Sequence, residues 1–180
     1  MPLATLQSLT FVGVRPIPVQ IEVHLSAGLP SFALVGLPDA EIRESKERVR
    51  SALLNSGFEF PSQRITVNLA GTGERKGGAG MDLAIAIGLL VAQEIIHPSV
   101  VEKMAFIAEL GLDGSLRPTA GMAPLVDAVS DYEVVVADKK LIGKPKGTFS
   151  VLRSKKNHFW NILCQFFEMP FPNDIQECIS

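Results

Sequence analysis

A run of ten apolar residues at positions 83–92 limits the folds open to this 180-residue chain more than any other sequence feature. The run is about half as long as a segment that crosses a bilayer, so it predicts a soluble protein. Because the run is apolar nearly all round, it predicts a helix over about 81–92 that lies buried at the centre of a domain. The residues expected in that core are Leu83, Ile85, Ile87 and Leu90.

The other apolar positions repeat with the periods of strands and of one further clear helix. The apolar residues at 19–25 alternate with polar ones, which is typical of a half-buried strand. A stripe of Ile42, Ser45, Val49 and Leu53 predicts a helix with charged residues on its remaining face. Further strands are predicted at 5–14, 31–35, 64–69, 105–110 and 133–137, and a third helix at 122–130.

The predicted order of elements is β-β-β-α-β-α-β-α-β, with strands first and alternation afterwards. This order favours an α+β or mixed α/β domain with two layers. We expect one domain over residues 1–148. Residues 149–180 are predicted to form a strand–helix extension, with a short strand at 149–152 and a helix capped by Ser154, which could pack on the same domain.

Composition and cysteine content indicate the compartment and exclude some kinds of site. The chain has 47% hydrophobic and 20% charged residues and a formal net charge of −2, as in an ordinary globular protein. Cys164 and Cys178 lack the spacing of a zinc site or a disulfide framework and suit a reducing compartment. The N-terminus lacks the features of a signal peptide. We therefore expect a cytoplasmic protein with no metal site and no membrane partner.

Five short sequence blocks carry a resemblance to a known family. They are Val35-Gly-Leu-Pro38, Arg48-Val-Arg-Ser-Ala52, Ile65-Thr-Val-Asn-Leu-Ala70, Asp82-Leu83 and Glu109-Leu-Gly-Leu-Asp-Gly-Ser-Leu-Arg-Pro118. Through them, residues 5–165 resemble the N-terminal domain of the ComM/YifB family, the magnesium-chelatase-like AAA+ ATPases. The resemblance implies an α+β fold like that of ribosomal protein S5 domain 2 and of Lon protease, in which helices pack on a two-layer mixed sheet.

The same resemblance implies a role and a set of partners. In the family, this domain accompanies a hexameric ATPase that uses ATP and magnesium and is implicated in DNA processing during natural transformation. The chain would then be an accessory domain that serves assembly or DNA contact. Its expected partners are the AAA+ ATPase module or further copies of the parent protein, with DNA as another candidate.

The residues that catalysis would need are missing from the expected positions. A Lon-type peptidase uses a serine nucleophile at the start of the buried helix and a lysine base. The resemblance places the serine at or near Gly80 and the lysine near Ala123. The phosphate-binding pattern Gly-x-x-x-x-Gly-Lys-Ser/Thr does not occur either. We therefore predict no catalytic residue and no cofactor in this chain, with ATP and magnesium bound only by the family's ATPase module.

Two groups of basic residues are candidates for weak nucleic-acid binding. Arg75 and Lys76 lie in a loop at 71–80 that contains five glycines and precedes a helix, where backbone amides favour an anion. Arg48 and Arg50 lie on the charged face of the first helix. The structural alternatives are a flexible replacement for the proline-bearing loop of the family, and a solvated helix face.

Two other functions remain alternatives to the accessory role. One is a free-standing nucleic-acid-binding module of S5-like fold, which requires a contiguous basic face and an affinity that falls steeply with salt. The other is a degenerate Lon-type peptidase, which requires a nucleophile that the sequence does not offer.

Overall fold

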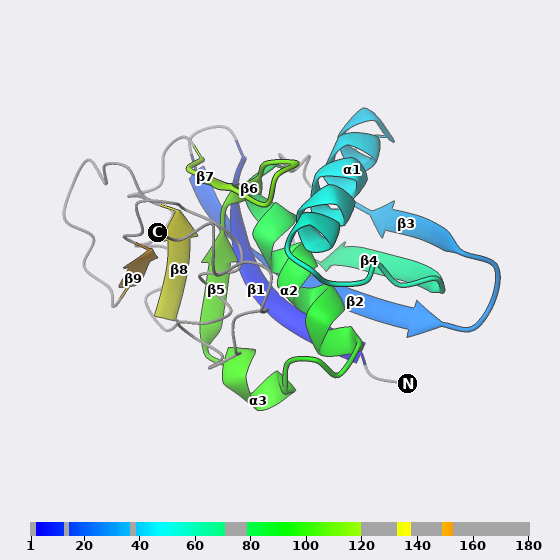
Figure 1. The fold of residues 1–180 in the computed structure, drawn as a ribbon. Coiled ribbons are helices and arrows are strands. Elements are labelled where there is room, and N and C mark those ends of the chain that lie inside the picture. The colour runs from blue at the N-terminus through cyan, green and yellow to red at the C-terminus, as the bar shows by residue number, and fades with distance from the viewer. Residues whose placement is uncertain are drawn as a thin grey trace, which may run out of the picture.

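The computed structural model describes residues 3–12, 15–36, 39–70, 79–119, 133–137 and 149–152. Over these residues the chain forms a seven-stranded sheet in the order β3-β4-β2-β1-β5-β8-β9 and a two-stranded ribbon, β6-β7 (Figure 1). The strands are β1 (Leu3–Val12), β2 (Arg15–Ser26), β3 (Ser31–Val35), β4 (Arg64–Ala70), β5 (Met104–Ile107), β6 (Glu109–Leu110), β7 (Leu116–Arg117), β8 (Glu133–Ala137) and β9 (Phe149–Leu152). The helices are α1 (Asp39–Asn55), α2 (Asp82–Ala92) and α3 (Pro98–Val101), with a 3-10 turn, η1 (Ala79–Met81).

The large sheet combines antiparallel and parallel pairs. β2 pairs antiparallel with both β1 and β4. β3 with β4, β1 with β5, β5 with β8, and β8 with β9 are parallel pairs. Parallel neighbours need a crossover connection, and α1 supplies the one between β3 and β4. This mixed sheet with packed helices confirms the predicted α+β class.

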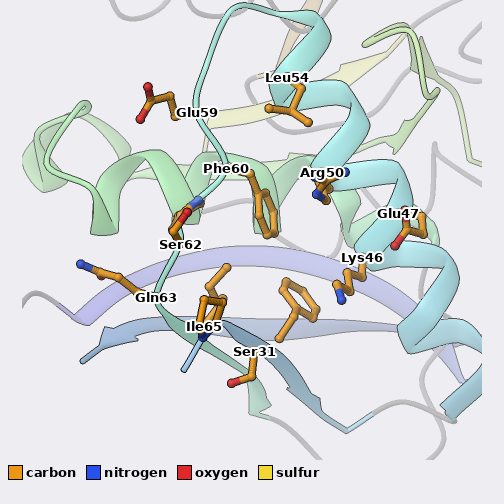
Figure 2. A pocket seen from close by; sticks show the side chains of 13 residues that line it. Ser31, Lys46, Glu47, Arg50, Leu54, Glu59, Phe60, Ser62, Gln63 and Ile65 are labelled. Atoms are coloured by element: carbon orange, nitrogen blue, oxygen red, sulfur yellow. The ribbon is translucent and has the colours of Figure 1, made fainter. Parts of the chain in front are cut away.

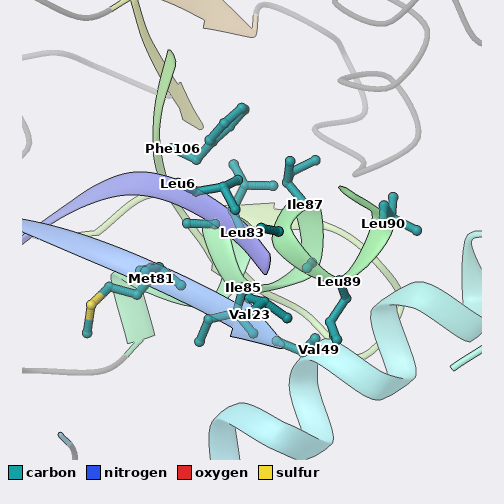
Figure 3. Packing of buried hydrophobic residues seen from close by; sticks show 14 of the residues in the cluster. Leu6, Val23, Val49, Met81, Leu83, Ile85, Ile87, Leu89, Leu90 and Phe106 are labelled. Carbon is teal, nitrogen blue, oxygen red and sulfur yellow. The ribbon is translucent and has the colours of Figure 1, made fainter. Parts of the chain in front are cut away.

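The helix α2 lies at the centre of the hydrophobic core, as its apolar sequence predicts. All eleven of its residues are buried. The helix packs on β1, β2 and β5 of the large sheet and on α1 (Figure 1). The predicted core residues are confirmed as fully buried, and Figure 3 shows them among their neighbours: Leu83, Ile85, Ile87 and Leu90.

The helix α2 approaches the sheet most closely at Gly88. A Cβ atom on Gly88 would lie 2.7 Å from Cγ2 of Val23 in β2 and 2.9 Å from Cδ1 of Leu6 in β1. Both distances are shorter than normal van der Waals contacts, and close-packed interiors leave little room for neighbours to move. Glycine at this position therefore allows the helix to lie directly on the two central strands.

The helix α1 presents its predicted stripe to the core. Ser45, Val49 and Leu53 are each fully buried, since residues three or four apart share one face of a helix. The side chain of Ile42, which belongs to the same predicted stripe, lies outside the described residues. The buried stripe positions α1 against α2 and leaves the opposite face of α1 to the solvent.

The strand predicted at 105–110 is wrong in one respect, because the structure divides it into two. β5 ends at Ile107, and the next residue, Ala108, bonds to the start of α2 instead of to a strand. Its N–H donates to the carbonyl oxygen of Gly80 at 3.0 Å, and its carbonyl oxygen accepts from the N–H of Leu83 at 3.2 Å. The chain then leaves the large sheet and forms β6, which pairs with β7.

A tight turn at Asp113-Gly114 joins the two strands of the β6–β7 ribbon. Gly114 has a φ of +80°, which favours glycine, and its N–H donates to the carbonyl oxygen of Gly111 at 3.0 Å. Two donors on Ser115, its N–H and its hydroxyl, bond to Oδ1 of Asp113 at 3.0 and 2.6 Å. The turn is therefore held by side-chain as well as backbone bonds.

The predicted strand at 149–152 is present as β9. It pairs in parallel with β8 and so continues the large sheet. The predicted boundary between residues 148 and 149 therefore falls between two neighbouring strands of one sheet. The helices predicted at 122–130 and after Ser154 lie outside the described residues.

The central position of α2 predicts a large effect of a single core truncation. Ile87→Ala should lower the free energy of unfolding by about 2–5 kcal/mol, because it removes buried methyl groups and leaves a cavity. Denaturant unfolding followed by circular dichroism measures the change. Leu54→Ala is the control, since Leu54 is 44% exposed on α1, and its loss should cost about 0.5 kcal/mol or less. Equal effects of the two substitutions would show that α2 is not the core element.

Candidate functional site

Asp82 is the only fully buried charged side chain among the described residues, and it lies at the start of α2. Its carboxylate accepts hydrogen bonds from Oγ of Ser45 at 2.8 Å and from the N–H of Leu110 at 3.3 Å. Arg48 donates from Nε to Oδ2 at 2.5 Å and from Nη2 to Oδ1 at 3.3 Å. One carboxylate therefore connects α1, α2 and β6.

In this cluster, burial and charge pairing shift the pKa of each ionisable group in opposite directions. Removal from water raises the pKa of the Asp82 carboxyl to about 6, although Arg48, Ser45 and the N–H of Leu110 each favour the ionised form. Burial by itself would lower the pKa of the Arg48 guanidinium, but the hydrogen bond and the charge of Asp82 raise it above its ordinary value. At neutral pH the pair is therefore ionised, and Arg48 supplies the counter-charge.

The bonding of Asp82 suits a structural clamp better than an acid or base. Each carboxylate oxygen accepts two hydrogen bonds, Oδ1 from Ser45 and Arg48, and Oδ2 from Arg48 and Leu110. A general base must reach the proton that it abstracts, and a fully buried carboxylate with both oxygens engaged does not present a free position to a substrate. The cluster therefore stabilises the junction of the two helices.

The prediction that Arg48 lies on a solvated helix face is wrong. Its side chain is only 18% exposed and is directed towards Asp82, while it also contacts the exposed Glu44 at 3.6 Å. The physical reason is that a buried carboxylate requires a charged and hydrogen-bonded partner. Sequence reasoning gave Asp82 no role. Two signals could have revealed it, namely an acid at the start of an apolar helix and Ser45 within an apolar stripe.

Arg50 has a different environment from Arg48, although both lie on α1. It is exposed and lines a groove of about 600 Å³ between α1, the start of β3 and the segment 59–63 (Figure 2). Its guanidinium carbon lies 6.0 Å from the centre of the Phe60 ring, which is within cation–π distance. The Phe60 ring stacks on Phe32, with centroids 6.4 Å apart. Lys46 and Glu47 also line the groove, so its charge is mixed.

The remaining predicted site residues are divided between the described and undescribed parts of the chain. Arg75, Lys76 and Ala123 lie outside the described residues, so the loop contact and the lysine position stay predictions. Gly80 lies in η1, where an added Cβ would be 3.0 Å from Cγ2 of Thr119. A serine in place of Gly80 would therefore press on Thr119.

Two further expectations concern metals and membranes. Within the described ranges, no group of three or more His, Cys, Asp or Glu side chains could hold a metal ion. The helices in those ranges are also too short or too polar for any of them to cross a bilayer.

Comparison with known proteins gives consistent matches over most of the chain. Residues 21–139 match the family described as subunit ChlI of Mg-chelatase. The chain is 45% identical over 139 residues to Competence protein ComM of Haemophilus influenzae, which covers 76% of this chain and 27% of that protein. The protein YifB of Salmonella typhimurium is 45% identical over 121 residues, and YifB of Escherichia coli is 39% identical over 139 residues.

The coverage of those two YifB proteins is similar to that of ComM. The matches cover 67% and 76% of this chain, and 24% and 28% of the Salmonella and Escherichia proteins. The chain therefore spans about a quarter of the length of the curated relatives that it matches.

Removal of Arg48 should destabilise the protein strongly. Arg48→Ala leaves the Asp82 carboxylate buried without its counter-charge, and such changes cost about 3–5 kcal/mol. Chemical denaturation at neutral pH measures the loss. Glu44→Ala is the matched control, because it removes an exposed partner of the same arginine and should cost about 0.5 kcal/mol or less. A loss below about 1 kcal/mol for Arg48→Ala would contradict the clamp.

The pKa of Asp82 predicts a pH dependence of stability. Because the folded value of about 6 lies above the ordinary value of 3.8, the folded state binds a proton more tightly than the unfolded state. The resulting stability is complete below about pH 4 and is lost as the pH rises through about 6. Relative to Asp82→Asn, the wild type should therefore lose up to about 3 kcal/mol between about pH 4 and pH 7. Urea unfolding over that range gives the difference, and parallel curves for the two proteins would refute the prediction.

Proposed function

Because the chain belongs to the family of Mg-chelatase subunit ChlI, in its ComM/YifB branch, we propose that it is a non-catalytic N-terminal accessory domain of a magnesium-chelatase-like ATPase. The proposed role lies in DNA processing during natural transformation, through assembly of the ATPase or contact with DNA. The identity to Competence protein ComM over three quarters of the chain is the observation that carries this proposal.

The chemistry around α2 supports the non-catalytic part of the proposal. The start of this helix is where a Lon-type nucleophile would stand, and Gly80 and the buried Asp82 occupy it. The oxygens of Asp82 are engaged by α1 and β6, and an added Cβ on Gly80 would press on Thr119. In the proposal, ATP and magnesium bind to the remaining part of the parent protein, because the relatives are about four times as long as the matched segment.

The finer fold assignment is part of the same proposal. We infer the fold of ribosomal protein S5 domain 2 and of the Lon catalytic domain. The antiparallel β1–β2 pair, the crossover from β3 through α1 to β4, and α2 packed on the central strands support it. A cytoplasmic location also belongs to the proposal, and it rests on the cysteine content.

The proposal can be tested by exchanging the matching segment between related proteins. In Haemophilus influenzae, the segment of Competence protein ComM that matches this chain would be replaced by the chain itself. We expect the hybrid to support transformation, whereas deletion of the segment should not. Transformation frequency is the readout, with ATP hydrolysis by the purified hybrid as the control for an intact ATPase. A hybrid that hydrolyses ATP normally but fails in transformation would contradict the accessory role.

The same hybrid distinguishes assembly from DNA contact. Arg75→Ala/Lys76→Ala should lower DNA affinity if the loop touches phosphates, and the slope of log affinity against log salt should fall by about one per lost contact. Arg43→Ala/Lys103→Ala is the matched control, because both residues are exposed and removal of either pair changes the net charge equally. Fluorescence anisotropy on single- and double-stranded oligonucleotides measures binding. Equal affinities for the two variants would assign the role to assembly.

A further inference from the structure

Arg48 lies between two sets of acidic partners, one in the interior and one at the surface. On the inner side, its Nε donates to Oδ2 of the fully buried Asp82 at 2.5 Å. On the outer side, its Nη1 lies 3.6 Å from Oε2 of Glu44, whose side chain is 71% exposed. Glu109 in β6 is also close enough for its charge to raise the pKa of the Arg48 guanidinium. The Arg48 side chain therefore lies at the boundary between the interior and the water.

The inner partner keeps its charge only while the buried carboxyl has lost its proton. Burial favours the neutral form of Asp82 and raises the pKa of its carboxyl to about 6. A neutral Asp82 no longer balances the charge of Arg48, and a guanidinium that stays in the interior without an ion pair is costly. The carboxylate of Glu44 keeps its contact with water, which favours its ionised form. It therefore remains as an alternative partner when Asp82 is protonated.

The junction of α1 and α2 does not need Arg48 once Asp82 is neutral. Oγ of Ser45 lies 2.8 Å from Oδ1 of Asp82, and a hydroxyl group can either donate or accept a hydrogen bond. A protonated Oδ1 can therefore donate to Ser45. Oδ2 still accepts from the N–H of Leu110 in β6. The neutral carboxyl is then fully hydrogen-bonded without a counter-charge.

The described elements that pack on α2 bring few other charges towards Asp82. β1, β5 and η1 contain no charged residue, and the core-facing residues of β2 are apolar. On α1, Glu41 lies one turn before Ser45, and its Oε2 is buried without a hydrogen-bond partner. On the ribbon, Glu109 lies 3.7 Å from Arg117. Both glutamates favour a neutral Asp82, because like charges repel, and Arg117 offsets the charge of Glu109.

We propose that Arg48 is a proton-controlled switch that pairs with Asp82 in the interior at neutral pH and moves outward to Glu44 and Glu109 when Asp82 is protonated. The junction of α1, α2 and β6 stays closed in both states, but acidification adds an arginine to the surface between α1 and β6. The proposal goes beyond the accessory role, because it depends on the buried cluster alone. It would stand even if the role in transformation were wrong.

NMR spectroscopy of the full chain follows the position of Arg48 directly. Its Nε–Hε signal reports whether the guanidinium is bonded to the buried carboxylate and protected from solvent exchange. We expect this signal to shift and to lose protection between about pH 7.5 and about pH 5. The transition should have the same midpoint as the carboxyl carbon signal of Asp82. Arg50 is the internal control, because it is exposed on the same helix and should show no transition with that midpoint.

Asp82→Asn is the matched variant, because its amide has the shape of the carboxyl but carries no charge. The Arg48 signal of this variant should stay at its acid position over the whole pH range. The backbone amide spectrum and circular dichroism confirm that the variant is folded.

The stability of Arg48→Ala provides an independent test. If the interior needs Arg48 only while Asp82 is ionised, the cost of its removal should grow with pH above the midpoint. The equilibrium constant of unfolding, relative to wild type, should rise about tenfold per pH unit there, and so up to a hundredfold by about pH 8. Urea unfolding measures the ratio. Arg50→Ala is the control, and its ratio should not change with pH.

Three results would overturn the proposal. The first is an Asp82 carboxyl that stays ionised down to about pH 5, because the trigger would then be missing. The second is an Arg48 signal that keeps its neutral-pH position while Asp82 is protonated, which would show that the side chain does not move. The third is a ratio for Arg48→Ala that stays constant over the whole pH range.

Discussion

The burial of the Asp82 carboxylate is the constraint on which the arrangement of helices and sheet depends. A charge removed from water must be neutralised and hydrogen-bonded, and the partners come from α1 and β6. Ser45 and Arg48 lie three residues apart, so both reach the carboxylate only when one face of α1 is turned towards α2. The backbone hydrogen bonds of Ala108 with Gly80 and Leu83 also hold the start of α2 against the residue that follows β5.

The buried Asp82 cluster also gives two neighbouring arginines of α1 different environments. Arg48 and Arg50 of α1 look similar in sequence, but Arg48 points inward and Arg50 points outward. The inward one neutralises Asp82. The outward one stacks near Phe60 in a groove beside β3, an edge strand whose outer side is unpaired among the described residues. The proposed accessory role accordingly rests on contacts with other molecules and not on turnover at the buried cluster.

Much of the fold could be predicted because burial leaves a period in the sequence. The alternation in β2 and the apolar run of α2 each record which side chains face the core, and both elements formed as expected. The end of β5 at Ile107 could not be predicted, because the sequence stays apolar through the next residue, Ala108. That end depends on bonds to Gly80, which lies 28 residues earlier in the chain. For the candidate site, Arg50 is exposed as expected, whereas Arg48 is not.

The sequence by itself determined which segments become strands and helices and which of their faces are buried, because these properties depend on neighbours a few residues apart. It also carried the blocks that identify the family. Only the tertiary structure decided that Arg48 pairs with Asp82, 34 residues away, and that β3 stands at the edge of the sheet. The physical reason is that charge pairs and neighbouring strands depend on contacts between distant segments, whereas local periodicity depends only on residues a few positions apart.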